Sequence, residues 1–290
     1  MLLPIVVGVD GSESSLGAID WAADEAALHG LPLRLVHACL WERYEGPAFT
    51  ESAGVASERL LAQTIIDRAT ERAQQGHPDV RIAVDIVPED AEAALLREAR
   101  RATAVVTGCR GRGPIRGALL GSVSRSLATR APCTVVVVRG PQRNRQAANG
   151  PVVIGVDDPA SSAAAIRFAF HEAQARRSVL EAVRAWRRPA HRARAHPLLV
   201  GNPAHEHEDQ AAALLDRALR DAEREHPDVP VRRVITEGPA HHVLLTHSAT
   251  ADLLVLGTPR RHGPLGLPLG SVAHAALHHA DCPVAVVPQR

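Results

Sequence analysis

One stretch in the first half of the chain carries residue types that hold an anion. From Thr107 to Ser124 the sequence reads TGCRGRGPIRGALLGSVS, with five glycines and two closing serines. Glycine lets successive backbone N–H groups turn towards one anion and lets that anion approach closely. A helix expected to begin at Ser122 adds its amino-terminal dipole, and Arg110, Arg112 and Arg116 add positive charge. The pattern predicts a phosphate-holding loop.

The alternative is that these glycines only shape turns in a long connection. Loops of this length in compact domains usually have a function, which favours the phosphate interpretation. The chain contains no lysine, since all 33 basic residues are arginine. This excludes a P-loop lysine, a Schiff-base lysine and a lysine general base.

No catalytic or metal-binding constellation accompanies the loop. There is no G-x-S-x-G sequence and no recognisable Ser/His/Asp set, so we predict no catalytic residue. Of the 16 histidines, 13 fall in the second half, but no H-E-x-x-H or carboxylate triad accompanies them, so we predict no metal site. A net charge of +1 and 2% aromatic residues give no reason to expect nucleic-acid binding.

Short apolar runs alternate with helical patterns on both sides of the loop. This alternation predicts α/β architecture with parallel sheets, in which ligands bind at the carboxyl ends of the strands. The expected strands are 5–9, 33–38, 82–87, 104–107, 134–138, 152–156, 179–185, 231–235, 253–256 and 284–287. The expected helices are 15–28, 57–74, 90–100, 122–130, 161–175, 209–224, 240–247 and 271–279.

The chain is an internal repeat. Gly8-Val9-Asp10 recurs as Gly155-Val156-Asp157 after 147 positions, and Gly121-Ser122-Val123 recurs as Gly270-Ser271-Val272 after 149. Separated matches at nearly one offset indicate a tandem duplication. We therefore expect one domain over 1–140, a polar linker over 141–150 and a second domain over 151–290, each doubly wound around a five-stranded parallel sheet.

The loop pattern G-x2-G-x9-G-[ST] is formed by Gly108, Gly111, Gly121 and Ser122. Together with the stretch 8–12, GVDGS, it resembles the universal stress protein family, more specifically its ATP-binding subgroup in the tandem two-domain form. The resemblance implies a Rossmann-like, adenine nucleotide alpha-hydrolase-like fold. It further implies ATP, with or without Mg²⁺, as the ligand, and a regulatory or sensing role in stress adaptation rather than catalysis.

The resemblance also assigns roles by position in the first copy. Asp10 is implied to lie beside the adenosine, and Ala38 to line the adenine pocket. The remaining positions are implied to wrap the ribose and phosphates: Gly108, Gly111, Gly121, Ser122, Val123 and Ser124.

The second copy departs from this pattern. Asp157, Gly257, Gly270 and Ser271 remain, but Arg260 stands where the first copy has Gly111. Prolines at 259, 264 and 268 remove donor N–H groups, and Asp158 adds a second carboxylate after the first strand. We expect the second nucleotide site to be weakened or lost.

Two other function classes stay open: an enzyme that hydrolyses or transfers phosphate or adenylate from ATP, and a nucleotide-free interaction scaffold.

The apolar last strands, 134–138 and 284–287, are edge candidates that would either join the two copies as an intramolecular pseudo-dimer or form a homodimer. An unknown regulatory protein partner is expected. Four cysteines without a C-x-x-C pair favour a cytoplasmic protein, and the first ten residues are too short for a membrane span.

Overall fold

The computed structural model describes residues 2–39, 53–110, 120–141, 150–187, 203–258 and 269–289. Gly111, the second glycine of the glycine-rich loop, lies outside these ranges, as do most of the linker and the segment 259–268 of the second copy. Predictions that concern those residues remain predictions.

Each half contributes five strands and four α-helices within these ranges. The first half runs β1 (Ile5–Gly8), α1 (Glu13–His29), β2 (Leu33–Ala38), α2 (Ala53–Gly76), β3 (Ile82–Val87), α3 (Ala91–Glu98), the short 3-10 helix η2 (Ala99–Arg101), β4 (Ala104–Gly108), α4 (Ser122–Arg130) and β5 (Thr134–Val138). The second runs β6 (Val152–Gly155), α6 (Pro159–Arg176), β7 (Leu180–Trp186), α7 (Pro203–Glu225), β8 (Val231–Glu237), α8 (Ala240–Ser248), β9 (Leu253–Thr258), α9 (Ser271–His279) and β10 (Val284–Pro288).

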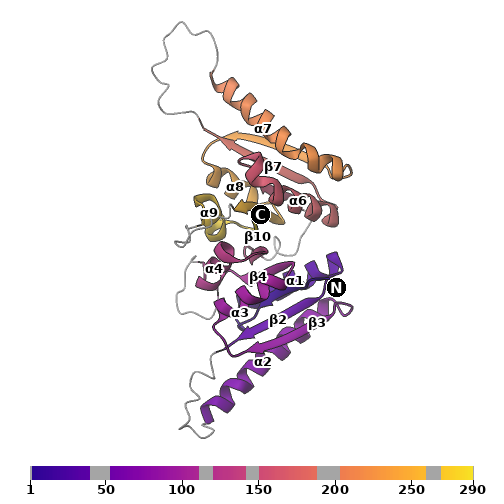
Figure 1. Cartoon of the computed structure of the whole chain (residues 1–290), viewed down its shortest axis with the longest axis vertical. Coiled ribbons are helices and arrows are strands. Elements are labelled where there is room, and N and C mark those ends of the chain that lie inside the picture. The colour runs from indigo at the N-terminus through magenta and orange to yellow at the C-terminus, as the bar shows by residue number, and fades with distance from the viewer. Residues whose placement is uncertain are drawn as a thin grey trace.

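The ten strands form one sheet in the order β3-β2-β1-β4-β5-β10-β9-β6-β7-β8. Within each half all neighbouring strands are parallel, which confirms the predicted doubly wound α/β fold. The halves meet where β5 and β10 pair antiparallel, with Val136 opposite Ala285. The apolar last strands thus join the two copies within one chain (Figure 1).

Helices cover both faces of this sheet. Side chains of α1, α2, α6 and α7 pack in one buried cluster, which includes Ile19, Phe170 and Leu215. Side chains of α3, α4, α8 and α9 pack in another, which includes Leu127 and Leu277. In Figure 1, α2 lies near the lower end of the molecule and α7 near the upper end, with β10 between the halves. The chain therefore forms a three-layer α/β/α structure.

Helix termini follow from local sequence. Ser12 caps α1, since its hydroxyl accepts the Ser15 N–H, and Gly30 ends that helix with a left-handed φ of 62°. In the second half Asp158 caps α6 by accepting the Ser161 N–H. The additional carboxylate of the second copy therefore serves as a helix cap.

The two long outer helices begin earlier than predicted. α2 starts at Ala53 rather than Ser57, and α7 at Pro203 rather than Asp209. Amphipathic periodicity does not mark these first turns. Pro203 fits the first turn of α7, and Ala53 and Ala56 are strong helix formers in the first turn of α2. None of the described helices combines the length and apolar character needed to cross a bilayer.

Candidate functional site

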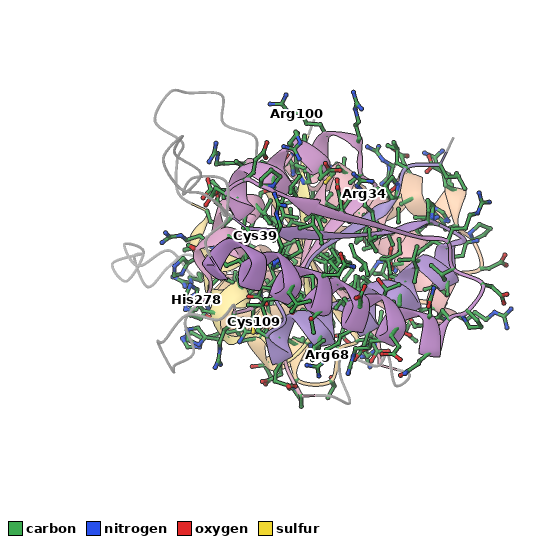
Figure 2. The ribbon with its side chains drawn as sticks, turned by 90° about the horizontal axis from the view of Figure 1, so that it is seen from below. Arg34, Cys39, Arg68, Arg100, Cys109 and His278 are labelled. Carbon is green, nitrogen blue, oxygen red and sulfur yellow. The ribbon has the colours of Figure 1, made fainter. Side chains whose placement is uncertain are left out.

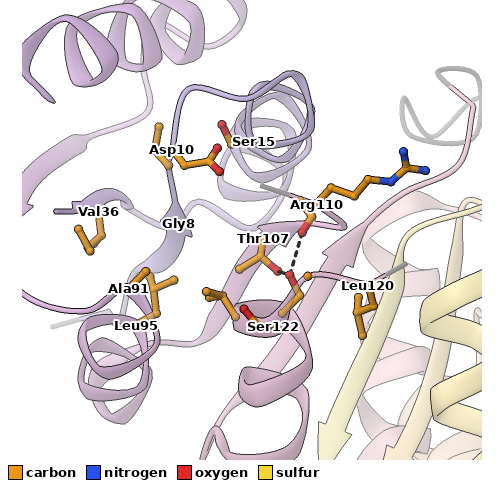
Figure 3. Close-up of a pocket in the computed structure, with 16 residues that line it drawn as sticks. Gly8, Asp10, Ser15, Val36, Ala91, Leu95, Thr107, Arg110, Leu120 and Ser122 are labelled. Atoms are coloured by element: carbon orange, nitrogen blue, oxygen red, sulfur yellow. Dashed lines mark hydrogen bonds between the residues drawn. The ribbon is translucent and has the colours of Figure 1, made fainter. Parts of the chain in front are cut away.

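A cavity of about 470 Å³ opens in the first half beyond the carboxyl ends of β1 and β4 (Figure 3). This is the point where strand order reverses, because β1 lies between β2 and β4. The structure brings seven of the eight first-copy residues named from the sequence to this cavity: Asp10, Ala38, Gly108, Gly121, Ser122, Val123 and Ser124.

One side of the cavity is apolar. Val9 contributes from the position after β1 and Val36 and Ala38 from β2, while Ala91 and Leu95 contribute from α3. Sequence reasoning named only Ala38 among these. Val9 and Val36 could have been found by extending the site along the ends of the strands. Ala91 and Leu95 come to the cavity only through the packing of α3.

The opposite side carries a short chain of hydroxyl groups. Thr107 Oγ1 donates to Ser124 Oγ over 3.2 Å, and Ser124 Oγ donates to the Gly108 carbonyl over 2.9 Å. Both side chains are buried, so these bonds hold α4 against the end of β4. Ser124 therefore has a structural role as well as a place in the cavity wall.

The amino terminus of α4 faces the same cavity. Gly121 is its N-cap residue and makes no side-chain capping bond, while Ser122, Val123 and Ser124 form the first turn. The Gly121 N–H donates to the Cys109 carbonyl over 2.9 Å, which ties the far end of the loop to β4. First-turn N–H groups without a side-chain acceptor are suited to hold an anion.

The turn after β1 supplies the rim. Asp10 Oδ1 accepts the Ser12 N–H over 2.9 Å, and Gly11 between them has a left-handed φ of 76°. Glycine is required there because an L side chain rarely adopts that conformation. Asp10 is half-buried and is the only carboxylate among the lining residues in the described part of the chain.

Gly108 has a different reason to be glycine. A Cβ at this position would lie 2.5 Å from the Ser14 carbonyl oxygen and 2.6 Å from its carbon. The end of β4 therefore approaches the α1 backbone too closely for any side chain. Sequence reasoning gave this glycine a phosphate contact, and the structure adds a packing requirement that applies without ligand.

The second copy keeps the frame but loses the hydroxyls. Asp157 follows β6, Gly257 lies in β9, and Gly270 is the N-cap of α9, which starts at Ser271. At the offset of 149, however, Thr107 corresponds to Leu256 and Ser124 to Ala273. The hydroxyl chain of the first copy therefore has no counterpart at these positions.

The second copy also carries a positive charge, that of Arg184, beside the carboxyl end of β6. In the first copy His37 Nδ1 lies 2.7 Å from the Val9 carbonyl oxygen. Arg184 takes the equivalent place, and its Nη1 donates to the carbonyls of Val156, over 3.3 Å, and of Asp157. A guanidinium thus lies at the edge where the first copy presents a compact imidazole.

Comparison with known proteins decides the family. The family described as the universal stress protein family matches residues 1–139 and again 149–288. The chain belongs to the universal stress protein family. Two universal stress proteins of Mycobacterium tuberculosis are 33% and 34% identical to it, over 98% and 99% of this chain and 97% and 96% of their own. One of Mycolicibacterium smegmatis is 33% identical over 99% of this chain and 97% of its own.

Solved structures support the same fold. A universal stress protein from Archaeoglobus fulgidus superimposes with a TM-score of 0.74 at 14% identity, covering 99% of this chain and 98% of its own. A functionally unknown protein from Pseudomonas aeruginosa gives 0.62 at 16% identity, with 99% and 92% covered. The tandem arrangement of this universal stress protein therefore recurs across full-length neighbours.

Proposed function

We propose that the first half of this universal stress protein binds ATP, with or without Mg²⁺, and that the protein is a cytoplasmic regulatory or sensing module in stress adaptation. One observation carries the proposal. Residues named from the sequence pattern at four separate strand and helix ends, those of β1, β2, β4 and α4, converge on a single cavity. Its volume lies within the range usual for small-molecule sites.

The two sides of the cavity match the two ends of a nucleotide. The apolar wall formed by Val36, Ala38 and Leu95 is suited to a flat base. The first turn of α4 offers N–H donors and the Ser122 hydroxyl to phosphate oxygens. Arg110, at the outer rim in Figure 3, adds positive charge. This arrangement needs no lysine.

Mg²⁺ would enter with the nucleotide. Mg²⁺ is usually held by one or two carboxylates together with substrate phosphates. Asp10 is the one carboxylate among the lining residues that the structure describes, and one of its oxygens already accepts the Ser12 N–H. Phosphate oxygens and water would therefore supply most of the ligands.

We propose that the second half binds ATP more weakly or not at all. Leu256 and Ala273 remove the hydroxyls, and Arg184 changes the charge beside the β6 strand end. We further propose that the first half is not a catalyst. Among the described residues that line its cavity, none is a histidine that could act as general base, and the Asp10 carboxylate accepts a hydrogen bond from the Ser12 N–H.

The proposal is tested on the purified full chain. Mass spectrometry of the perchloric-acid extract should detect adenine nucleotide, and added ATP should raise the melting temperature by several degrees. A nucleotide-free scaffold would show neither effect. Release of ADP, AMP or pyrophosphate well above background, lost in Asp10→Asn, would support an enzyme and contradict the regulatory proposal.

A further inference from the structure

Two buried glutamates and two half-buried cations lie where the two halves meet on the α1 and α6 face of the sheet. Glu25 and His29 come from α1, and Glu172 and Arg176 from α6. Glu25 corresponds to Glu172, and His29 to Arg176, at the offset of 147 that relates Asp10 to Asp157. The cluster therefore lies across the approximate two-fold relation between the copies.

Each cation contacts both carboxyl groups. His29 Nε2 lies 3.2 Å from Glu25 Oε1 and 3.2 Å from Glu172 Oε1. Arg176 Nη2 contacts Glu25 Oε2 and lies 3.1 Å from Glu172 Oε2. Two of these contacts, His29 with Glu172 and Arg176 with Glu25, join one half of the protein to the other. The other two lie within a single helix.

These shared contacts bring the two carboxyl groups together, since His29 and Arg176 each contact one oxygen of Glu25 and one of Glu172. Glu25 is 5% exposed and Glu172 is 2% exposed, so water does not separate their charges. Two carboxylates that share a site repel when both are ionised, and a proton between them removes the repulsion. Such a pair titrates as a unit.

We propose that Glu25 and Glu172 are a proton-binding pair that makes the docking of α1 on α6, and hence of the two halves, depend on pH near neutrality. With one proton bound, the carboxyl pair is hydrogen-bonded across the interface. With none, Glu172 is buried as a second anion beside Glu25, and its lost hydration and their repulsion weaken docking, although His29 and Arg176 offset part of this cost. This role does not depend on whether the cavity binds nucleotide.

The direction of the effect follows from the proton affinities. Burial and the neighbouring Glu25 charge raise the pKa of Glu172 from 4.5 to about 7. The docked form therefore holds this proton more tightly than the separated form, so its contribution is complete below pH 4.5 and is lost as the pH rises through 7. Despite burial, Arg176 and His29 hold the pKa of Glu25 down to about 2, so Glu25 stays ionised throughout this range.

The other groups that face the pair set the useful pH window. Hydrogen bonds that His29 donates to the Glu172 and Glu25 carboxylates raise its pKa to about 10, so it stays positive, and its contribution too declines as the pH rises above 6.5. Burial and the charge of His29 lower the pKa of His171, so docking weakens in acid below 6.5. Trp21 covers Arg176, with its ring centroid 5.9 Å from the guanidinium carbon. Further out, Asp252 acts on Arg176 and His226 on His171.

A metal ion is the rival occupant, since His29, His171 and Glu172 have donor atoms within 4.8 Å of one another. The imidazole rings of His29 and His171 are stacked, however, with only 13° between their planes and 4.9 Å between their centroids. A metal ligand bond lies in the plane of its ring, so one ion cannot lie in both planes. The carboxylates are also already paired with Arg176.

The direct test uses the unaltered full chain. Carbon-13 NMR of glutamate labelled at the side-chain carboxyl should show one resonance that titrates with a midpoint near pH 7. Glu172→Gln should remove it, and Glu25→Gln should move it to lower pH because the repelling charge is gone. The exposed Glu208→Gln should leave it unchanged. If every glutamate resonance of the unaltered chain titrates below pH 6, the proposal is wrong.

Hydrogen exchange tests the consequence for docking. We compare amide protection in α1 and α6 at pH 6 and pH 8 after correction for the intrinsic exchange rate. Protection should fall about tenfold more in the unaltered chain than in Glu172→Gln, which stays neutral at both pH values. Glu208→Gln should behave like the unaltered chain. An equal fall in protection in all three proteins would overturn the proposal. A shift of the carboxyl NMR midpoint by more than half a pH unit on adding EDTA would also overturn it, in favour of a bound metal ion.

Discussion

The hydroxyl of Ser124 connects the fold and the cavity. It accepts from Thr107, donates to the Gly108 carbonyl and lies in the first turn of α4. We predict that Ser124→Ala lowers the free energy of unfolding by about 1 kcal/mol, the usual value of one hydrogen bond. ATP affinity should fall several-fold. Urea denaturation and calorimetry measure the two effects.

The second copy supplies the matched control. Ala273 occupies the equivalent position, which shows that alanine fits this turn of the helix. Ala273→Ser should leave ATP binding unchanged, since Leu256 offers no partner hydroxyl and Arg184 remains. A gain of a second ATP site in this variant would contradict the assigned asymmetry.

At the residue scale, the sequence predicted some of the residues that line the cavity but not others. Glycines, serines and Asp10 could be named because their types and spacing carry chemistry. Ala91 and Leu95 could not, since apolar residues of α3 look like core until packing places them at the cavity. The loss of hydroxyls at Leu256 and Ala273 was readable from the offset of 149, once the pairing of Thr107 with Ser124 was known.

The contact of β4 with α1 is an element-scale constraint. Gly108→Ala would place its Cβ 2.5 Å from a backbone oxygen, so α1 must move. We predict a loss of about 2–4 kcal/mol in unfolding free energy, as expected of overpacking against backbone. The equivalent Gly257→Ala meets its nearest atoms at 3.1–3.4 Å and should cost less. Equal losses would contradict this reason for Gly108.

Arg139 links β5 to a helix of the other half. Its Nη2 donates to the His278 carbonyl over 2.7 Å, and its Nη1 contacts the Ala276 and Leu277 carbonyls, all at the carboxyl end of α9. Removing these bonds by Arg139→Leu should lower the unfolding free energy by about 1–3 kcal/mol. Arg68→Leu, on the exposed surface of α2 in Figure 2, is the control and should change it by less than about 0.5 kcal/mol.

At the element scale, order and type were predictable because the apolar runs and helical patterns alternate without ambiguity. β2, β3, β5, α4 and α9 have the predicted bounds. The starts of α2 and α7 were missed, since their first turns, AGVA and PAHE, carry no amphipathic period. The Arg139 bonds depend on how two halves pack, which local pattern does not encode.

At the scale of the whole molecule, the pairing of β5 with β10 removes an apolar edge from each half. Both strands are buried along nearly their full length. We predict that residues 1–140 produced alone form a homodimer through β5, because the unpaired edge would seek an equivalent strand. Sedimentation equilibrium at micromolar concentration measures this. A folded, monomeric half would contradict the role given to this edge.

The duplication was readable from the offsets, but the single ten-stranded sheet was not. The sequence left open whether the apolar last strands pair within one chain or between chains, and the antiparallel register of Val136 with Ala285 shows pairing within the chain. The proton-binding pair of Glu25 and Glu172 was equally out of reach. Both residues look like ordinary helix glutamates until α1 meets α6 across the repeat.

Calorimetry with ATP on two matched variants tests the central claim most directly. Alanine at Gly121 makes only ordinary contacts, the nearest at 3.6 Å, and alanine at Gly270 meets open space, so both variants should fold. The account predicts one ATP per chain, with affinity at least fivefold weaker in Gly121→Ala and unchanged in Gly270→Ala. Two equal sites per chain, or equal loss in both variants, would contradict it.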